Sequence, residues 1–338
     1  MATQTPQPQE PEKVKWAPLS VPIERRVQTL AVLFWALQFF IILGAFFLLA
    51  LFPSTWPVLI PYVCWVVFID RAERKGGRRV EALRNMPIWT WFVDYFPIRL
   101  HKTADVPPTR PYIFGYHPHG VISLGAWGNF ATNATGFSKL FPGIKLHLCT
   151  LDPNFRWPFT REYLLGMGLV SVDRKSLEYV LHKGESAMIV IGGAEEAAKA
   201  RPFTNDLVLG RRFGFVKLAL RYGAWLVPVF SFGEGDIWDI KESETGDKIS
   251  HWTKKYFGVT LPLIFGRGVF NYNYGIMPYR RAINTVVGEP LEMPHIPEPT
   301  EEQVREHHDR YVAALKKVWD ANKDVYAKQR RRSLRLVE

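Results

Sequence analysis

Residues 29–52 contain no charged side chain and consist mostly of aliphatic and aromatic residues. At a rise of about 1.5 Å per residue, a helix over this range is roughly 36 Å long, which is enough to cross the hydrocarbon core of a bilayer with some tilt. A cleavable signal peptide has a shorter apolar core that starts nearer the first residue, so that interpretation is excluded. The run therefore predicts a membrane-embedded helix.

A second apolar stretch, residues 58–69, follows a proline-rich connection. As a helix it is roughly 18 Å long, which is too short to span a bilayer alone. Basic residues flank the two stretches on both sides, namely Arg25 and Arg26 before them and Arg71, Arg74, Lys75, Arg78 and Arg79 after them. Because basic clusters prefer the cytosolic face, we expect residues 27–69 to form a hairpin that enters and leaves from the cytosol. The alternative is a single span with its flanks on opposite sides, which glycosylation of the Asn133 sequon would reveal.

The rest of the chain divides into two parts. Residues 1–26 are expected to be a disordered tail, because their first part is rich in Pro and Gln. In residues 70–338, short β-rich runs alternate with helical stretches, which predicts an α/β domain with a mixed sheet flanked by helices. The expected strands are 111–116, 144–150, 169–172, 187–191, 225–230 and 284–287, and the expected helices are 176–183, 214–222 and 301–328, the last capped by Thr300.

Composition limits the function. The formal net charge is +11, from 43 Lys and Arg against 32 Asp and Glu, which suits a membrane surface, a nucleic acid or a phosphorylated substrate. Two cysteines exclude a disulfide framework and a four-cysteine metal site. The chain also lacks the G-x-S-x-G, GxxxxGK, GxGxxG and HExxH motifs. A serine esterase, a nucleoside triphosphatase and a zincin are therefore not supported by their usual motifs.

The most informative motif is Tyr-His-Pro-His-Gly at residues 116–120, which follows an apolar strand. Loops at the carboxyl ends of such strands are where α/β folds bind ligands. A His at a helix N-terminus stays neutral, as a general base must be. His117 and His119 are therefore candidates for acid–base chemistry. A structural role remains the alternative, and a metal site would need further ligands.

Three further segments carry candidate binding residues. Arg174 follows a predicted strand and suits a phosphate. Gly192 and Gly193 follow a buried strand and allow a ligand to approach the backbone, and Glu196 comes next to them. Arg212 and Lys217 are candidates for binding phosphates, while surface salt bridges and packing are the alternative explanation for all three segments.

In this order, the four segments resemble the type-2 diacylglycerol acyltransferase family. The resemblance covers roughly residues 25–326 and is most specific over residues 212–234, which match R-x-G-F-x-K-x-A-x-x-x-G-x-x-x-V-P-x-x-x-F-G-E at every specified position. Residues 192–196 supply the GGAxE motif. More distantly, the layout is similar to bacterial lysophosphatidate acyltransferases, which implies the glycerolipid acyltransferase fold. Those enzymes pair a His with an Asp five residues later, whereas Ile122 and Leu124 stand at these positions here.

The resemblance implies transfer of a fatty acyl group from acyl-CoA to diacylglycerol, with no metal or redox cofactor and no covalent acyl-enzyme. It implies His119 as the general base, because plant members of the family keep only the second His. His117 would be a supporting donor, Glu196 the carboxylate that orients the His119 ring, and Gly120 part of the oxyanion site. The implied partners are acyl-CoA, diacylglycerol and membrane lipid, without nucleic acid, at the endoplasmic reticulum membrane or on lipid droplets.

Several readings stay open at this point. Monoacylglycerol or a fatty alcohol is the alternative to diacylglycerol as the acyl acceptor. The sequence does not indicate the oligomeric state. A metal-dependent hydrolase using His117 and His119 and a non-catalytic membrane scaffold are alternatives from other classes. The aromatic run at residues 89–95 is expected at the membrane interface, with core packing as its alternative.

Overall fold

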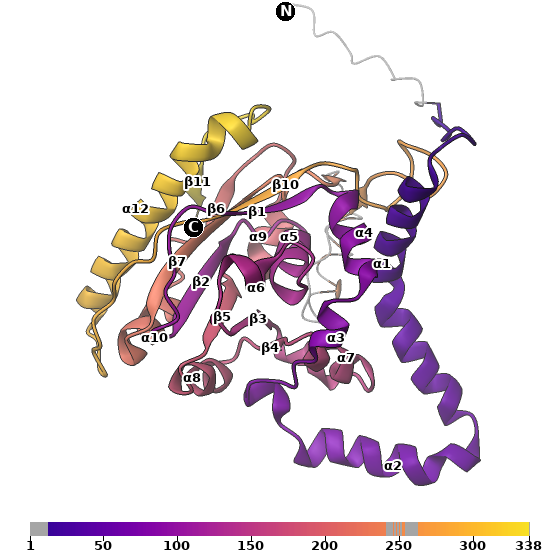
Figure 1. Cartoon of the computed structure of the whole chain (residues 1–338), viewed down its shortest axis with the longest axis horizontal. Helices are drawn as coiled ribbons and strands as arrows, with labels where there is room; N and C mark the ends of the chain where they lie inside the picture. Colours follow the sequence, from indigo (N-terminus) through magenta and orange to yellow (C-terminus); the bar gives the residue numbers. More distant parts are fainter. Residues whose placement is uncertain are drawn as a thin grey trace, which may run out of the picture.

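The computed structural model describes residues 13–240 and 263–337, together with positions 246, 248, 250, 252 and 253. A twisted sheet runs through the body of the molecule with helices on both of its faces, and a helical excursion from the N-terminal part projects away from it (Figure 1). This mixed sheet with flanking helices was predicted from the alternation of short apolar runs.

Seven strands form the main sheet, in the spatial order β1-β10-β7-β2-β5-β3-β4. In that order their bounds are Ile98–Lys102, Ile283–Val287, Trp225–Phe232, Tyr112–His117, Ser186–Val190, Leu146–Thr150 and Val170–Ser171. From β7 to β4 all neighbours are parallel, whereas β10 is antiparallel to β7 and parallel to β1. The six expected strands are confirmed with ends shifted by one or two residues, and β1 is a strand that the sequence analysis missed.

The central strand β2 is buried along its whole length, and alternate side chains supply the two halves of the core. Tyr112, Phe114 and Tyr116 pack with α4 (Pro87–Tyr95), α5 (Leu124–Ala126), η4 (Trp127–Ala131) and α6 (Phe137–Leu140). Ile113 faces the opposite side and packs with α8 (Arg174–His182), α10 (Gly214–Tyr222) and α12 (Glu301–Tyr326). The sheet is therefore covered on both faces, as a mostly parallel sheet must be.

The last helix, α12, is fixed at its start by the predicted Thr300 cap. The Thr300 hydroxyl accepts a hydrogen bond from the backbone of Gln303, whose side chain accepts one from the Thr300 backbone. The helix lays Tyr311, Leu315 and Trp319 against the sheet. It ends at Tyr326, two residues before the predicted end. The remaining elements are α3 (Glu81–Arg84), η5 (Asp152–Arg156), α7 (Thr160–Gly166), α9 (Gly193–Lys199), β6 (Asp206–Val208), β8 (Asp239–Ile240), β9 (Ile264–Phe265) and β11 (Arg335–Val337).

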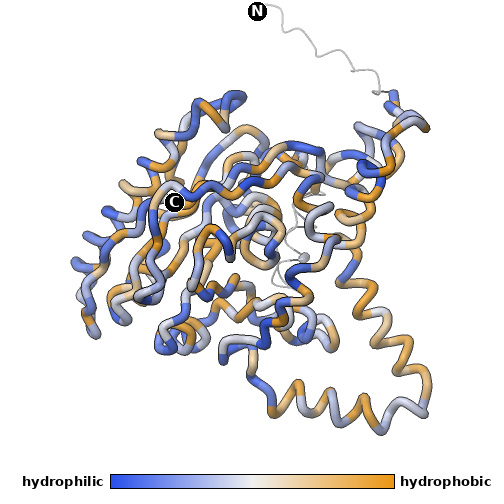
Figure 2. Tube along the Cα trace, viewed as in Figure 1, coloured by the Kyte–Doolittle hydropathy of each residue, from blue (hydrophilic) through white to orange (hydrophobic). Residues whose placement is uncertain are grey.

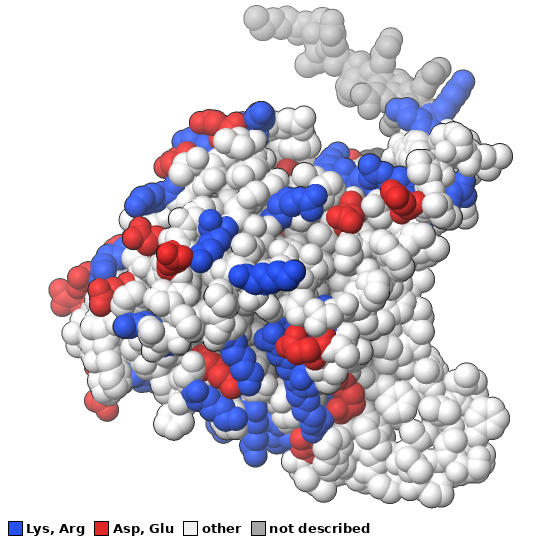
Figure 3. All heavy atoms as spheres, in the orientation of Figure 1, with Lys and Arg blue, Asp and Glu red and all other residues white. Residues whose placement is uncertain are grey.

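The apolar excursion consists of α1 (Ile23–Ala50), η1 (Pro53–Thr55), α2 (Trp56–Cys64) and η2 (Trp65–Ile69). The first part of α1 packs on the body, where Trp35 lies 5.6 Å from the ring of Phe92. The rest leaves its side chains uncovered, so that Phe47 is 58% and Leu51 75% exposed. Figures 2 and 3 show this projection as hydrophobic and without charge.

Ile23–Ala50 and Pro53–Arg74 are both long and apolar enough to cross a membrane. So much uncovered apolar surface is typical of a segment that lies in lipid. The chain leaves the body along α1 and returns to the same body after Ile69, which is the path of a hairpin (Figure 1). Its insertion from the cytosolic side stays a prediction.

Two expectations about the N-terminal region were wrong. Residues 13–22 are not a tail, because Trp16 forms a β-bridge with Asn271 and the Ala17 amide donates to the Phe270 carbonyl at 2.8 Å. Residues 1–12 lie outside the described residues. The aromatic run of α4 is mostly core, since Trp89 and Phe92 are buried between α1 and the sheet.

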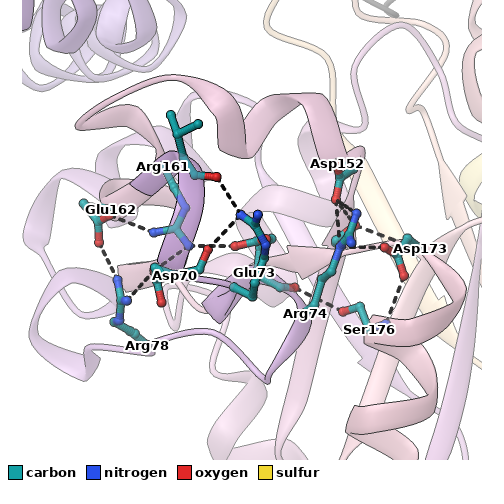
Figure 4. Close-up of polar contacts among 12 residues, drawn as sticks. Asp70, Glu73, Arg74, Arg78, Asp152, Arg161, Glu162, Asp173 and Ser176 are labelled. Atoms are coloured by element: carbon teal, nitrogen blue, oxygen red, sulfur yellow. Dashed lines mark hydrogen bonds and ion pairs between the residues drawn. The ribbon is translucent and has the colours of Figure 1, made fainter. Parts of the chain in front are cut away.

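A network of ion pairs fixes the point at which the hairpin returns to the body (Figure 4). Arg161 of α7 is 1% exposed and contacts Asp70 and Glu73, the latter at 2.6 Å. Arg78 bridges Asp70 and Glu162. Burial alone would raise the pKa of Asp70, but hydrogen bonds from the two arginines outweigh it and lower the pKa. The network therefore holds the end of η2 against α7.

Replacement of Arg161 by Met should destabilise the fold by about 3–5 kcal/mol, because buried Glu73 then loses its ion-pair partner and Asp70 keeps only Arg78. Arg156→Met is the matched control, since Arg156 is 74% exposed and lies 3.8 Å from Asp152. An exposed pair of this kind contributes about 0–1 kcal/mol. Thermal unfolding of the two variants in the same detergent would measure the difference, and equal losses would contradict a structural role for the network.

Candidate active site

The His117–Gly120 loop follows β2 directly, at the carboxyl end of the sheet's central parallel strand. Gly120 has a φ of +57°. A Cβ at this position would lie 2.8 Å from the Glu234 backbone oxygen, so both the conformation and the close packing require glycine. The chain then turns into α5 through Ser123, whose amide donates to the His119 carbonyl at 3.1 Å. The loop is therefore held in a tight turn at the edge where parallel strands bind ligands.

The His119 ring is half-buried and has one nitrogen engaged. Nδ1 lies 3.2 Å from the Gly120 carbonyl oxygen, which can only accept, so Nδ1 carries the hydrogen and Nε2 keeps its lone pair. Nε2 has no partner among the described residues. Burial lowers the pKa of His119 below its usual 6.5, although the hydrogen bond to Gly120 acts in the opposite direction. At neutral pH the ring is therefore an unprotonated base with its free nitrogen available.

Glu196 lies beneath the loop and contacts its backbone. One carboxylate oxygen accepts a hydrogen bond from the His119 amide, and the other accepts one from the Val208 amide at 2.9 Å. Burial raises the pKa of Glu196 to about 7, against the effect of these hydrogen bonds. The predicted contact with the His119 ring is wrong, because the Gly120 carbonyl occupies that role. Glu196 positions the loop and is not a partner of the imidazole.

His117 faces the opposite side of the loop and is fully buried. Its Nε2 lies 3.0 Å from the Tyr311 hydroxyl of α12, which in turn lies 3.1 Å from the Gly115 carbonyl. Both contacts are satisfied when the hydroxyl donates to the carbonyl and Nε2–H donates to the hydroxyl. Nδ1 is then an acceptor without a partner in the described structure. This corrects the predicted role of His117 as a donor to substrate, since the ring joins β2 to α12.

Sequence reasoning missed Glu234 as a residue of the site. It follows β7, is 1% exposed, and accepts hydrogen bonds from the Tyr116 hydroxyl and, at 3.0 Å, from the Gly125 amide. Burial raises its pKa to about 7. In the sequence, Glu234 is the last residue of the longest matching motif, residues 212–234, and this position could have identified it. Glu234 fixes the start of α5 behind the His119 loop.

An apolar pocket of about 250 Å³ opens beside His119. Its walls include Trp35 of the hairpin and Trp127 of η4. The predicted binding residue Gly193 also lines it, with a φ of +64° at the start of α9. Gly192 is not part of its lining and packs closely against Glu196, since a Cβ at Gly192 would lie 2.2 Å from the Glu196 carboxyl group. The pocket therefore lies between the membrane helix and the candidate base.

A second pocket, of about 490 Å³, adjoins the first, since Val172 lines both. Its lining includes Arg174, Arg212 and Lys217, the residues expected to bind phosphates. Arg174 is the first residue of α8, after an Asp173 cap, and pairs with Glu178 at 2.7 Å. Arg212 lies 3.4 Å from Glu195, whereas Lys217 has no ion-pair partner among the described residues. The structure thus brings the three candidate residues to one pocket, and their binding of phosphate stays a prediction.

No group of three or more His, Cys, Asp or Glu residues within the described part of the chain is arranged to hold a metal ion. His117 and His119 contact different partners, the Tyr311 hydroxyl and the Gly120 carbonyl. The free nitrogen of His119 is suited to proton transfer. Next to it lie one pocket that fits an apolar group and one that fits an anionic group.

Glu196 should contribute stability that is lost as pH rises from about 4.5 to about 7, because native Glu196 retains a proton that the unfolded chain has already lost. Glu196→Gln should lower the melting temperature by removing one hydrogen-bond acceptor, and it should also flatten this pH dependence. Thermal unfolding in detergent at several pH values tests this, with the exposed Glu306→Gln as control. A slope unchanged in Glu196→Gln would contradict the raised pKa.

The chain is similar to known proteins over most of its length. A family model described as "Diacylglycerol acyltransferase" matches residues 48–337. Diacylglycerol O-acyltransferase 2A of Umbelopsis ramanniana is 46% identical, with 96% of this chain and 94% of that protein covered. Diacylglycerol O-acyltransferase 2 of Dictyostelium discoideum is 44% identical, covering 96% and 99%, and 2-acylglycerol O-acyltransferase 1 of Bos taurus is also 44% identical, covering 93% and 96%.

Among solved structures, the 1-acyl-sn-glycerophosphate acyltransferase PlsC from Thermotoga maritima is 13% identical and covers 89% of this chain and 97% of its own. Its TM-score of 0.41 is too low to establish a shared fold. The family match and the relatives extend over nearly the whole chain, including the His119 loop and both pockets. This chain belongs to the diacylglycerol acyltransferase family, whose members are acyltransferases.

Proposed function

We propose that this protein transfers a fatty acyl group from acyl-CoA to the free hydroxyl of diacylglycerol and so forms triacylglycerol. One observation carries the proposal. The unprotonated His119 lies in the wall of an apolar pocket, and that pocket shares Val172 with a basic pocket. An acyl-CoA molecule has the same division, with an apolar chain and a polyanionic end joined at the reacting thioester.

His119 acts as the general base of this reaction. An alcohol is too weak an acid to ionise before attack, so Nε2 removes the proton while the hydroxyl oxygen attacks the thioester carbonyl. The Nδ1–H bond to the Gly120 carbonyl stabilises the imidazolium that forms. Glu196 and Glu234 contribute by positioning, since both hold the backbone of the loop and neither contacts the ring.

The remaining steps need no further catalytic side chain. Backbone N–H groups of the turn at residues 120–122 are the donors for the tetrahedral oxyanion, because Val121 and Ile122 line the pocket beside His119. The C–O ester bond forms as the C–S bond breaks, and the CoA thiol, with a pKa of about 8.5, leaves as thiolate and takes up the proton held by His119. No acyl-enzyme, metal or redox cofactor takes part.

The basic pocket is the site proposed for the phosphates of CoA. Arg212 and Lys217 stand on its rim, and Arg212 Nη2 also lies 3.3 Å from the Gly192 carbonyl. This bond orients the guanidinium while leaving most of its donors for a phosphate. Arg174 adds a third cation from the first turn of α8.

The acceptor is proposed to come from the membrane. Trp35 of α1 forms part of the apolar pocket, so a diglyceride can enter from the lipid along the hairpin. The relatives named for diacylglycerol and those named for 2-acylglycerol have similar identity to this chain, which keeps monoacylglycerol as the alternative acceptor. The proposed location is the cytosolic face of the endoplasmic reticulum membrane, with lipid droplets as a second site.

His119→Gln should reduce acyl transfer by about 10²–10⁴-fold, because it removes the base but keeps the size of the side chain. Microsomes carrying each variant would be incubated with radiolabelled oleoyl-CoA and, separately, diacylglycerol, monoacylglycerol and a fatty alcohol. The exposed His295→Gln is the control. In the wild type, kcat/KM should be constant near neutral pH and fall at acidic pH as His119 becomes protonated, with a midpoint below 6.5.

Each outcome of this assay has a distinct meaning. Triacylglycerol formed by the wild type and by His295→Gln but not by His119→Gln supports both the acceptor and the base. Product from a different acceptor keeps the chemistry and corrects the substrate. An unaffected His119→Gln variant rules out His119 as the base.

Lys217→Ala should raise the KM for acyl-CoA about tenfold, which is the effect of losing roughly 1.4 kcal/mol of charge–phosphate attraction, and leave kcat nearly unchanged. The exposed Lys316→Ala on α12 is the matched control. With S-acyl pantetheine, which lacks the phosphates, wild type and Lys217→Ala should have the same KM. A tenfold difference with that donor would show that Lys217 acts on something other than phosphate.

A further inference from the structure

A third pocket, of about 630 Å³, lies where α1 meets the segment at residues 266–281. Four arginines line it: Arg25 and Arg26 from the first turn of α1, and Arg267 and Arg280 from the opposite wall. It shares no lining residue with the pocket of His119 or with the proposed CoA pocket. This arginine pocket is therefore a separate feature of the molecule.

Within the described part of the chain, no carboxylate compensates its positive charge. The pocket lining contains no Asp or Glu, and none of the four arginines has an ion-pair partner in the described structure. Arg280 is oriented by neutral acceptors, the Gln28 amide oxygen at 2.7 Å, the Arg25 carbonyl at 2.6 Å and the Thr29 hydroxyl at 3.0 Å. Burial, together with repulsion from Arg267 and Arg25, lowers the pKa of Arg280 to about 10. Cations held together in this way bind an anion more strongly than isolated ones.

Neighbouring carboxylates do not change this balance. Glu24 precedes Arg25 on α1 but does not line the pocket, and Asp94 of α4 lies 3.9 Å from Arg99. Arg267 is 7% exposed and stacks its guanidinium over Tyr272, with 4.9 Å to the ring centroid. Arg26 donates to the Leu19 carbonyl at 2.6 Å. All these contacts hold the guanidinium groups in place without neutralising them.

The position of the pocket indicates which anion it binds. The uncharged run of α1 begins at Thr29, so the arginines lie at the level where a bilayer's headgroups would be. Large apolar side chains of the two segments that form its walls, residues 16–30 and 266–281, stay uncovered. They are Trp16 (70% exposed), Leu19 (93%), Ile23 (72%), Phe270 (69%), Tyr274 (72%) and Ile276 (75%). Aromatic and basic residues together are typical of a surface that enters the headgroup region.

We propose that the arginine pocket binds the phosphate of an anionic glycerophospholipid from the same leaflet, with the lipid's acyl chains lying along Leu19 and Leu30. Free phosphate fits the charge but makes no use of the apolar rim. The arginine pocket is separate from the proposed catalytic site, and its ligand is neither the acyl donor nor the acyl acceptor of the proposed reaction. Binding there joins α1 to the 266–281 segment and so fixes the hairpin relative to the body.

The test uses the full chain purified in dodecyl maltoside and measures its melting temperature with increasing dioctanoyl phosphatidate. Saturable stabilisation is expected for the wild type, with less effect from dioctanoyl phosphatidylcholine or inorganic phosphate at the same concentration. Arg25→Gln/Arg26→Gln, which changes two exposed side chains, should weaken the apparent affinity by at least about tenfold. Arg267→Gln should do the same from the other wall of the pocket.

Three controls make the result decisive. Arg305→Gln/Arg310→Gln on α12 removes the same charge from an exposed surface far along the chain and should bind the lipid like the wild type. Without lipid, Arg25→Gln/Arg26→Gln should melt close to the wild type, because the lost Arg26 contact with the Leu19 carbonyl is offset by relief of the repulsion between Arg25 and Arg280. Equal stabilisation by inorganic phosphate, or unchanged lipid affinity in both pocket variants, would overturn the proposal. Acyl transfer measured separately distinguishes this outcome from failure of the proposed function.

Discussion

Two buried carboxylates hold the backbone on either side of His119, and the arrangement of the site depends on them. Glu196 binds the amide of His119 itself, and Glu234 binds the amide of Gly125 a few residues later. A carboxylate is costly to bury, and hydrogen bonds from backbone N–H groups offset that cost. The loop between the two amides consequently has little freedom to move. The His119 ring is oriented by its Nδ1 contact with the Gly120 carbonyl, and the two carboxylates hold the backbone that carries both groups.

Around this loop the fold brings together elements with different chemical character. α8 and α10 supply cations, η4 and β3 supply an apolar wall, and α1 adds Trp35 from the hairpin. Val172, just after β4, belongs to both pockets and marks where a charged group and a hydrocarbon chain of one ligand would separate. The hairpin is therefore both a proposed anchor and part of the wall beside the base.

The sequence predicted much of the sheet and pointed to the loop that holds His119, because both depend on local patterns. A short run of apolar residues is visible within a single strand, and the histidine motif is contiguous. The partners of the site residues were not predictable in the same way. Glu196 and Tyr311 contact residues that are distant in the chain, with separations of 77 positions from His119 and 194 from His117. Nothing in a local pattern indicates whether a carboxylate meets a ring or a backbone amide, and only the packed structure answers that.

The contact between Tyr311 and the end of β2 has a consequence for how the protein is made. The space above Gly115 is filled by the Tyr311 hydroxyl, which would lie 2.0 Å from a Cβ at that position. Tyr311 belongs to α12, which leaves the ribosome after the hairpin and after every strand of the main sheet. Since chains fold from the N-terminus as they are synthesised, the hairpin reaches the bilayer while the strand that carries His117 is still uncovered. The site is therefore completed last, after the proposed membrane hairpin has been synthesised.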